Sequence, residues 1–198
     1  MFLKRGQLPI FIVNLVYLSL ALLVFLGRNN YEFVLYIGII GAVLALILFT
    51  NKRVDYPNFV LWGLTLWGIM HMLGGGLLLN GGTMRLYELI LIPISEDYNF
   101  FRYDQLVHII GFGVATLVMY VLIKPNLKKK FGGWSLGIVI VMAGLGVGAL
   151  NEIQEFLAVV IVPETGVGGY INTSMDLVAD LVGAILAGVL IKFRKGRL

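Results

Sequence analysis

The chain has 198 residues, of which 59% are hydrophobic and only 13% are charged, and its mean hydropathy is +0.93. A soluble domain is about one quarter charged, so this composition excludes a water-soluble globule and indicates that lipid surrounds much of the chain. The absence of cysteine excludes disulfides, iron–sulfur clusters, thiolate metal sites and a cysteine nucleophile. The net charge of +4 does not indicate nucleic-acid binding, because the basic residues cluster between apolar segments, as in a membrane topology.

Six apolar stretches are long enough to cross a membrane, which takes about 20 residues of α-helix. In chain order they cover residues 8–26, 33–49, 59–79, 106–123, 134–162 and 175–193. The first stretch is similar to a secretory signal, but Gly27-Arg28-Asn29-Asn30 is not a small-residue cleavage site, so we interpret it as a retained helix. The sequence therefore predicts an all-α fold: one transmembrane domain over residues 1–198, a bundle of six helices with no soluble domain.

The basic residues predict the orientation of these spans. With the N-terminus in the cytoplasm, twelve of the 15 Lys and Arg residues lie on the inner side, and only Arg28, Arg85 and Arg102 lie on the outer side. This bias follows the positive-inside rule. Asp55 is the one acid of eleven that falls inside. We therefore expect a multi-pass protein of the cytoplasmic membrane with both termini in the cytoplasm.

The longest outer connection runs over residues 80–103 and contains an apolar run over residues 86–94. This run is too short to span, so we expect it to lie along the interface or to dip into the bundle. Glycine pairs such as Gly144 and Gly148 have the spacing that lets membrane helices approach closely, and we interpret them as packing positions.

Ionisable side chains inside the spans need a reason, because each costs about 2.5–3.5 kcal/mol at the centre of a membrane helix. Seven of them fall in the outer halves of four spans: His71, Asp104, His108, Glu152, Glu155, Asp176 and Asp180. Those on the fourth, fifth and sixth spans are spaced i,i+3 or i,i+4, so each pair shares a helix face. We expect the seven side chains to face the interior and to line one cavity that opens outward.

This cluster predicts a divalent metal site. Five carboxylates packed together repel one another, and a divalent cation would neutralise them better than Arg85 or Arg102. Helical bundles hold such ions with acidic and histidine ligands, and these ligand types suit Zn, Mn, Fe or Mg. The candidate ligands are His71, Asp104, His108, Asp176 and Asp180. Glu152 and Glu155 are the candidate catalytic bases.

Structural explanations compete with this prediction for single residues. Asp104 would favour a helix N-terminus through the macrodipole. Thr173-Ser174-Met175-Asp176 fits a capping box, which would make Asp176 structural. In structural explanations of the same kind, His71 would only form a hydrogen bond with a neighbouring helix, and Glu155 would face water. Asp180 lies about one turn deeper than a cap, so we expect a partner from another helix, and His108 lies at matching depth.

Four motifs carry a family resemblance. They are His71-Met72-Leu73-Gly74-Gly75, Tyr103-Asp104-Gln105-Leu106-Val107-His108, Asn151-Glu152-Ile153-Gln154-Glu155-Phe156 and Asn172-Thr173-Ser174-Met175-Asp176. Together they resemble the YjdF-type bacterial inner-membrane proteins. The last three also resemble VanZ-like proteins, although Asp180 stands where that family has Asn and Glu155 where it tends to have Gln. The resemblance implies a membrane protein linked to the cell envelope and supplies no reaction.

The first functional hypothesis is a metal-assisted membrane hydrolase acting on a lipid-linked or envelope substrate, with membrane lipids as its surroundings. The alternatives are an ion- or proton-coupled transporter and a non-catalytic envelope accessory protein, since intramembrane acids often mark ion paths. Against transport, the sequence shows no inverted repeat, and the inner halves of the spans are nearly uncharged.

Overall fold

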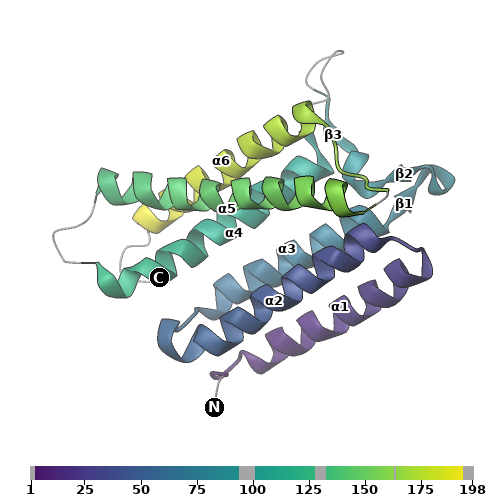
Figure 1. The fold of residues 1–198 in the computed structure, drawn as a ribbon. Helices are drawn as coiled ribbons and strands as arrows, with labels where there is room; N and C mark the ends of the chain where they lie inside the picture. The colour runs from purple at the N-terminus through teal and green to yellow at the C-terminus, as the bar shows by residue number, and fades with distance from the viewer. Residues whose placement is uncertain (1–2, 94–100, 128–132, 163, 194–198) are drawn as a thin grey trace.

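The computed structural model describes residues 3–93, 101–127, 133–162 and 164–193. Within these residues six helices are long and apolar enough to cross a membrane, which confirms the predicted all-α membrane fold. In chain order they are α1 (Leu8–Gly27), α2 (Tyr31–Val54), α3 (Asn58–Gly76), α4 (Tyr103–Ile123), α5 (Trp134–Ile161) and α6 (Tyr170–Phe193) (Figure 1). The basic residues Lys128–Lys130 and those over residues 194–198, which served to predict the orientation, lie outside the described part.

The six helices form two groups of three. Helix α1 packs on α2 and α3, whereas α4, α5 and α6 pack on one another, and α3 joins the groups by packing on α4 (Figure 1). The most extensive contact is between α4 and α6. It depends on Gly183, where an added Cβ would lie 2.2 Å from the backbone oxygen of Ile109 and 2.9 Å from the backbone nitrogen of Gly113. Two bare backbones therefore meet at this crossing.

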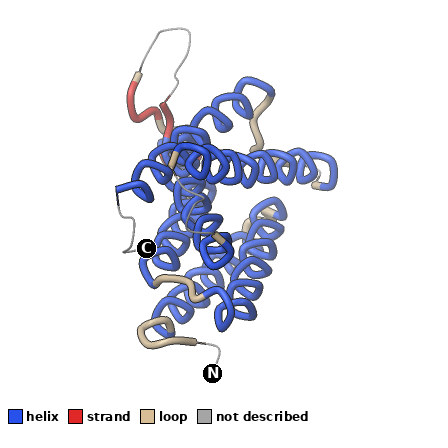
Figure 2. Tube along the Cα trace, turned by 90° about the vertical axis from the view of Figure 1, so that its left-hand side faces the viewer, coloured by secondary structure: helices blue, strands red, loops and turns tan. Residues whose placement is uncertain are grey.

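One end of the bundle carries the polar connections. Helices α1, α3 and α5 end there and α2, α4 and α6 begin there, so we call it the site end. The connection from α3 to α4 forms two antiparallel strand pairs, β1 (Leu78–Leu79) with β2 (Met84–Arg85) and β3 (Ile90–Ile92) with β4 (Phe101–Arg102). The β1–β2 pair lies beyond the ends of the helices (Figure 1), and β3 and β4 are drawn in red at the edge of the bundle in Figure 2.

The predicted apolar run over residues 86–94 is divided into two parts. A short 3₁₀ helix over Leu86–Glu88 packs against α3 and α4. The strand β3 that follows is exposed. The last residue of the run lies outside the described residues.

The start of α6 corrects one structural explanation. The helix begins at Tyr170, so Asp176 lies in its second turn and the predicted capping box over Thr173–Asp176 is wrong. Asn172 and Ser174 do not interrupt the helix, because each side chain donates a hydrogen bond within it. The hydroxyl of Ser174 donates to the Tyr170 oxygen at 2.8 Å, and the amide of Asn172 donates to a carboxylate oxygen of Asp176 at 2.5 Å.

Candidate functional site

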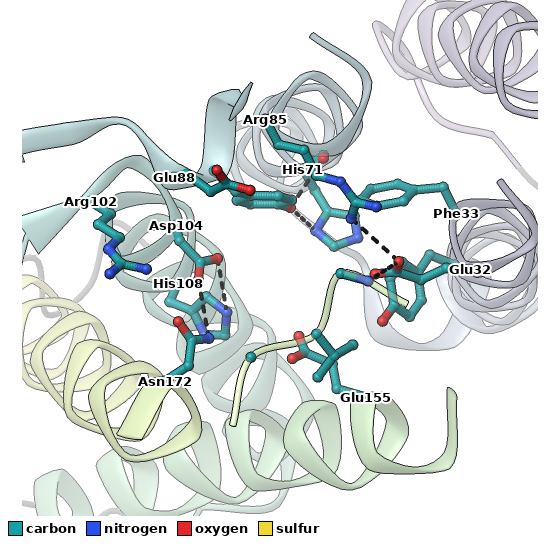
Figure 3. A pocket seen from close by; sticks show the side chains of 15 residues that line it. Glu32, Phe33, His71, Arg85, Glu88, Arg102, Asp104, His108, Glu155 and Asn172 are labelled. Atoms are coloured by element: carbon teal, nitrogen blue, oxygen red, sulfur yellow. Dashed lines mark hydrogen bonds and ion pairs between the residues drawn. The ribbon is translucent and has the colours of Figure 1, made fainter. Parts of the chain in front are cut away.

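A cavity of about 270 Å³ lies at the site end, between the two groups of helices (Figure 3). The connections after α3 and α5 close over it with Arg85, Glu88 and the backbone of residues 166–168. Of the seven predicted site residues, four line it: His71, Asp104, His108 and Glu155. The other three, Glu152, Asp176 and Asp180, are buried next to it. The seven therefore gather at one end of the bundle, but they do not all line one cavity.

His108 lies at the centre of the acidic groups. Its Nδ1 atom is 2.8 Å from Oδ1 of Asp180 and 4.0 Å from Oε1 of Glu152. Its Nε2 atom is 3.9 Å from Oδ1 of Asp104, one helical turn earlier on α4 (Figure 3). The expected approach of Asp180 and His108 is thus confirmed as a direct contact. Carboxylates lie at both edges of the imidazole ring.

Asp176 is fully buried and held by two amides. The side chain of Gln105 donates to Oδ1 at 2.7 Å, and that of Asn172 donates to Oδ2 at 2.5 Å. Asn172 also lies 3.4 Å from Oδ2 of Asp104, so one amide links the two carboxylates. Neither Gln105 nor Asn172 was among the predicted site residues. Both lie inside the motifs that carried the family resemblance, which was the signal available to find them.

Glu152 and Asp180 form the deepest acidic groups. Both oxygens of Glu152 and Oδ2 of Asp180 are buried and form no well-aligned hydrogen bond within the described residues, although Asn151 and Thr173 lie near Glu152. Their side chains are 6% and 0% exposed. Glu152, predicted as a catalytic base, therefore lies behind His108 rather than at the cavity.

Two groups of these side chains have the spacing of metal ligands. Asp104, His108 and Asp176 each place one donor atom within 4.8 Å of the others, and so do His108, Glu152 and Asp180. We call the first the cavity triad and the second the deep triad. They share His108. The deep triad is buried throughout, whereas Asp104 of the cavity triad is partly exposed and lines the cavity.

His71 belongs to neither triad. Its Nδ1 atom lies 2.5 Å from the hydroxyl of Tyr87, which also donates to its backbone oxygen at 3.1 Å. Burial raises the pKa of Tyr87 well above its usual range, so the hydroxyl stays protonated and remains a donor. The rings of Trp67, Tyr36 and Phe33 pack around the imidazole with centroids 5.4–5.6 Å away. The structure thus places His71 in an aromatic wall of the cavity.

Glu155 is the cavity acid of α5. Its Oε1 atom accepts a hydrogen bond at 2.9 Å from the side chain of Asn151, one turn earlier. Its side chain lines the cavity and is only partly buried (Figure 3). Of the two predicted bases, Glu155 is therefore the one that a bound molecule can reach.

Glu32 closes one side of the cavity and was not predicted as a site residue. It lies in the first turn of α2 but is only 3% exposed. One of its oxygens accepts a 2.7 Å hydrogen bond from the backbone of Gly166 and lies 3.4 Å from the Arg85 guanidinium (Figure 3). Acids are common at helix N-termini because they interact favourably with the helix macrodipole. The sequence position of Glu32 therefore did not indicate a site residue.

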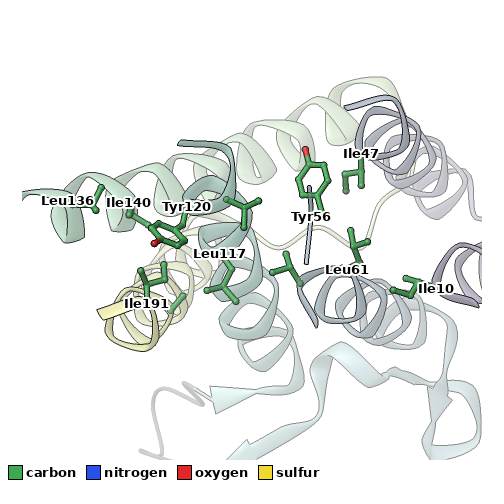
Figure 4. Packing of buried hydrophobic residues seen from close by; sticks show 12 residues of the cluster. Ile10, Ile47, Tyr56, Leu61, Leu117, Tyr120, Leu136, Ile140 and Ile191 are labelled. Atoms are coloured by element: carbon green, nitrogen blue, oxygen red, sulfur yellow. The ribbon is translucent and has the colours of Figure 1, made fainter. Parts of the chain in front are cut away.

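Buried side chains toward the opposite end are mainly apolar, although the side-chain amides of Gln7 and Asn51 are also buried there and bond to each other. A cluster of twelve buried side chains joins all six helices there, including Ile10, Ile47, Leu61, Leu117, Ile140 and Ile191 (Figure 4). None of the seven predicted site residues belongs to it. Within the described residues the acidic site is thus bounded on this side by packed hydrocarbon.

Comparison with known proteins agrees with this architecture. No curated protein and no solved structure matches the chain. One family model matches residues 8–197, which is nearly the whole sequence and covers all six helices and both triads. The chain therefore belongs to the DUF2238 family of predicted membrane proteins.

Proposed function

We propose that this protein is a metal-dependent membrane hydrolase acting on a lipid-linked or cell-envelope substrate. The supporting observation is the cavity triad: two carboxylates and an imidazole with donor atoms within 4.8 Å of one another, beside a cavity. Oxygen and imidazole donors of this kind suit Zn, Mn, Fe or Mg. In this proposal Asp104, His108 and Asp176 bind the ion.

The surroundings of the triad fit this role. Metal-binding histidines usually donate their second ring N–H to a carboxylate, which fixes the tautomer. The 2.8 Å contact from Nδ1 of His108 to Asp180 has this arrangement, and it leaves the lone pair of Nε2 on the side of Asp104. The amides of Gln105 and Asn172 hold the Asp176 carboxylate in place, and its oxygens keep lone pairs for an ion.

The proposed chemistry is activation of water. A divalent ion held by Asp104, His108 and Asp176 would supply Lewis-acid activation of water at the cavity. Glu155 lines the same cavity and is the proposed base that accepts the proton. With respect to the cavity ion, Asp180 acts through His108 and is a positioning residue.

The proposed substrate class follows from the location of the cavity. The twelve-to-three distribution of Lys and Arg supports an orientation with the site end on the outer side of the cytoplasmic membrane. A cavity at that depth faces lipid head groups and envelope precursors. The resemblance to YjdF-type and VanZ-like proteins supports the same assignment.

Metal analysis of the purified full chain tests this proposal. After exposure to Zn or Mn and removal of free ion, the protein should retain bound metal, and Asp104→Asn should lose the cavity ion because a neutral amide replaces a charged ligand. Asp55→Asn is the matched control, since Asp55 lies at the opposite end of the bundle and pairs with Lys4.

Loss of the cavity ion should also reduce hydrolysis of lipid-linked envelope precursors by at least 100-fold, the usual scale for removing a catalytic group. Equal metal content in wild type and Asp104→Asn would contradict the assignment. Proton-coupled flux in liposomes with no bound metal would instead favour the transporter alternative.

A further inference from the structure

The deep triad is short of hydrogen-bond donors, although Asn151 and Thr173 lie near Glu152. Both oxygens of Glu152 and one of Asp180 are buried with no well-aligned hydrogen bond within the described residues. Burying an ionised carboxylate in this way is costly unless a cation or a proton compensates it. The cavity ion proposed above does not contact these oxygens, because Glu152 and Asp180 belong to the other triad.

No Lys or Arg in the described lengths of the neighbouring helices supplies that compensation. In the described lengths of α4, α5 and α6 the single Lys or Arg is Lys192, which lies near the end of α6 and over the ring of Trp134 at 4.4 Å. His108 is the nearest basic group, and it faces three acids with one ring. One imidazole carries at most one positive charge.

The geometry of the deep triad fits a small ion. Metal–nitrogen and metal–oxygen bonds are about 2.0–2.2 Å, so adjacent ligands of one ion lie about 3 Å apart. The 2.8 Å separation of Nδ1 of His108 and Oδ1 of Asp180 has this size, and Oε1 of Glu152 lies 4.0 Å from the same nitrogen. Helix α5 approaches closely here, since a Cβ on Gly148 would lie 2.2 Å from Oδ2 of Asp180.

We propose that Glu152, Asp180 and Nδ1 of His108 bind a second divalent cation, so that the imidazole of His108 bridges two ions. The deep ion replaces the Nδ1 proton that Asp180 accepts when no deep ion is bound, and this proton is released to solvent when the ion binds. The inference rests on the proposed function for the cavity ion at Nε2 of His108. Neither Glu152 nor Asp180 lines the cavity, so the role of the deep ion is to neutralise the buried acids and to orient His108.

The number of ions per chain tests the inference. Purified full-length protein loaded with Zn or Mn should contain two ions. Glu152→Gln, which keeps size and removes charge, should retain one, and Asp104→Asn should also retain one. Glu88→Gln is the matched control, because Glu88 lines the cavity but belongs to neither triad, and it should retain two. Asp180→Asn should lose the deep ion as well, which covers a failure of Glu152→Gln to fold.

The outcomes separate the two proposals. One ion in the wild type that Asp104→Asn loses and Glu152→Gln keeps would overturn the deep ion and leave the cavity ion standing. One ion that Glu152→Gln loses and Asp104→Asn keeps would support the deep ion and contradict the proposed catalytic ion. No bound ion would overturn both, and the deep acids would then have to share a proton.

Discussion

At the residue scale, the contact between Asp180 and His108 joins the sixth helix to the fourth. A fully buried carboxylate of α6 lies 2.8 Å from the imidazole of α4. Asp180 has no alternative explanation as a helix cap, because it lies eleven residues into a helix that begins at Tyr170. Its position is therefore explained by its partner, which belongs to another helix.

Two substitutions of Asp180 separate its shape from its charge. Asp180→Asn keeps an acceptor oxygen for Nδ1–H of His108, so the protein should fold with near-normal yield and keep the cavity ion, with affinity weakened about 10- to 100-fold. Asp180→Leu leaves Nδ1 of His108 buried without a partner and should lower both stability and metal content. Metal analysis and thermal unfolding in detergent measure both effects. Equal behaviour of the two variants would show that the acceptor oxygen has no role.

Glu152 and Glu155 differ in their access to the cavity. Their i,i+3 spacing puts them on one face of α5, yet Glu155 lines the cavity and Glu152 is buried behind His108. Glu155 lies about one turn nearer the C-terminal end of α5, where Gly166 and Gly168 also line the cavity. For this reason we propose Glu152 as a metal ligand rather than as a catalytic base.

At the element scale, α5 and α6 approach closely, and Gly148 leaves room between them for the Asp180 carboxylate. A Cβ added at Gly148 would lie 2.2 Å from the Asp180 carboxylate, whereas one added at Gly146 would meet nothing within 4 Å. Glycine at position 148 thus has a local purpose beyond general packing. A Cβ at Gly144, one turn away, would lie 1.8 Å from the Thr116 hydroxyl, so the same stripe of α5 also faces α4.

The pair of glycines on α5 supplies a matched test. Gly148→Ala should displace the Asp180 carboxylate and lower the free energy of unfolding by about 1–3 kcal/mol, the usual effect of overpacking. It should also reduce metal content, although it changes no ligand. Gly146→Ala should be neutral or slightly stabilising, because alanine is the better helix former. Thermal unfolding of both variants in detergent would show the difference, and equal melting temperatures would argue against the close contact.

At the scale of the whole molecule, the buried acids lie at one end of the bundle, whereas the buried polar groups of the other end include the uncharged amides of Gln7 and Asn51. The acids and the cavity lie at the site end, and the twelve-residue apolar cluster joins all six helices at the opposite end. Within the described residues, the absence of a buried charged side chain from that other end favours a site that acts from one side of the membrane. It does not favour a continuous path for ions.

The orientation of the bundle can be measured with reporter fusions. A reporter at Lys129 or after Leu198, positions outside the described residues, should be cytoplasmic, and one at Gly168 should be external. The physical reason is the twelve-to-three excess of Lys and Arg on the predicted inner side. An external signal at Lys129 would reverse the orientation and put the cavity on the cytoplasmic side.

The sequence by itself determined the class of fold and the approximate helices. Composition requires lipid as the solvent, and the apolar stretches predicted α1 to α6 to within a few residues, because hydrocarbon allows only regular backbone across it. The sequence also indicated the acidic residues, since ionisable groups at that depth are costly and therefore rare.

Only the tertiary structure decided how these residues are grouped. Burial placed Glu152 with His108 and Asp180, and aromatic packing placed His71 with Tyr87, apart from both triads. Glu32 joined the cavity only because the connection after α5 folds back over α2. Spacing along one helix gives the face that a residue shares, but which helices turn those faces toward one another depends on packing between residues far apart in the chain.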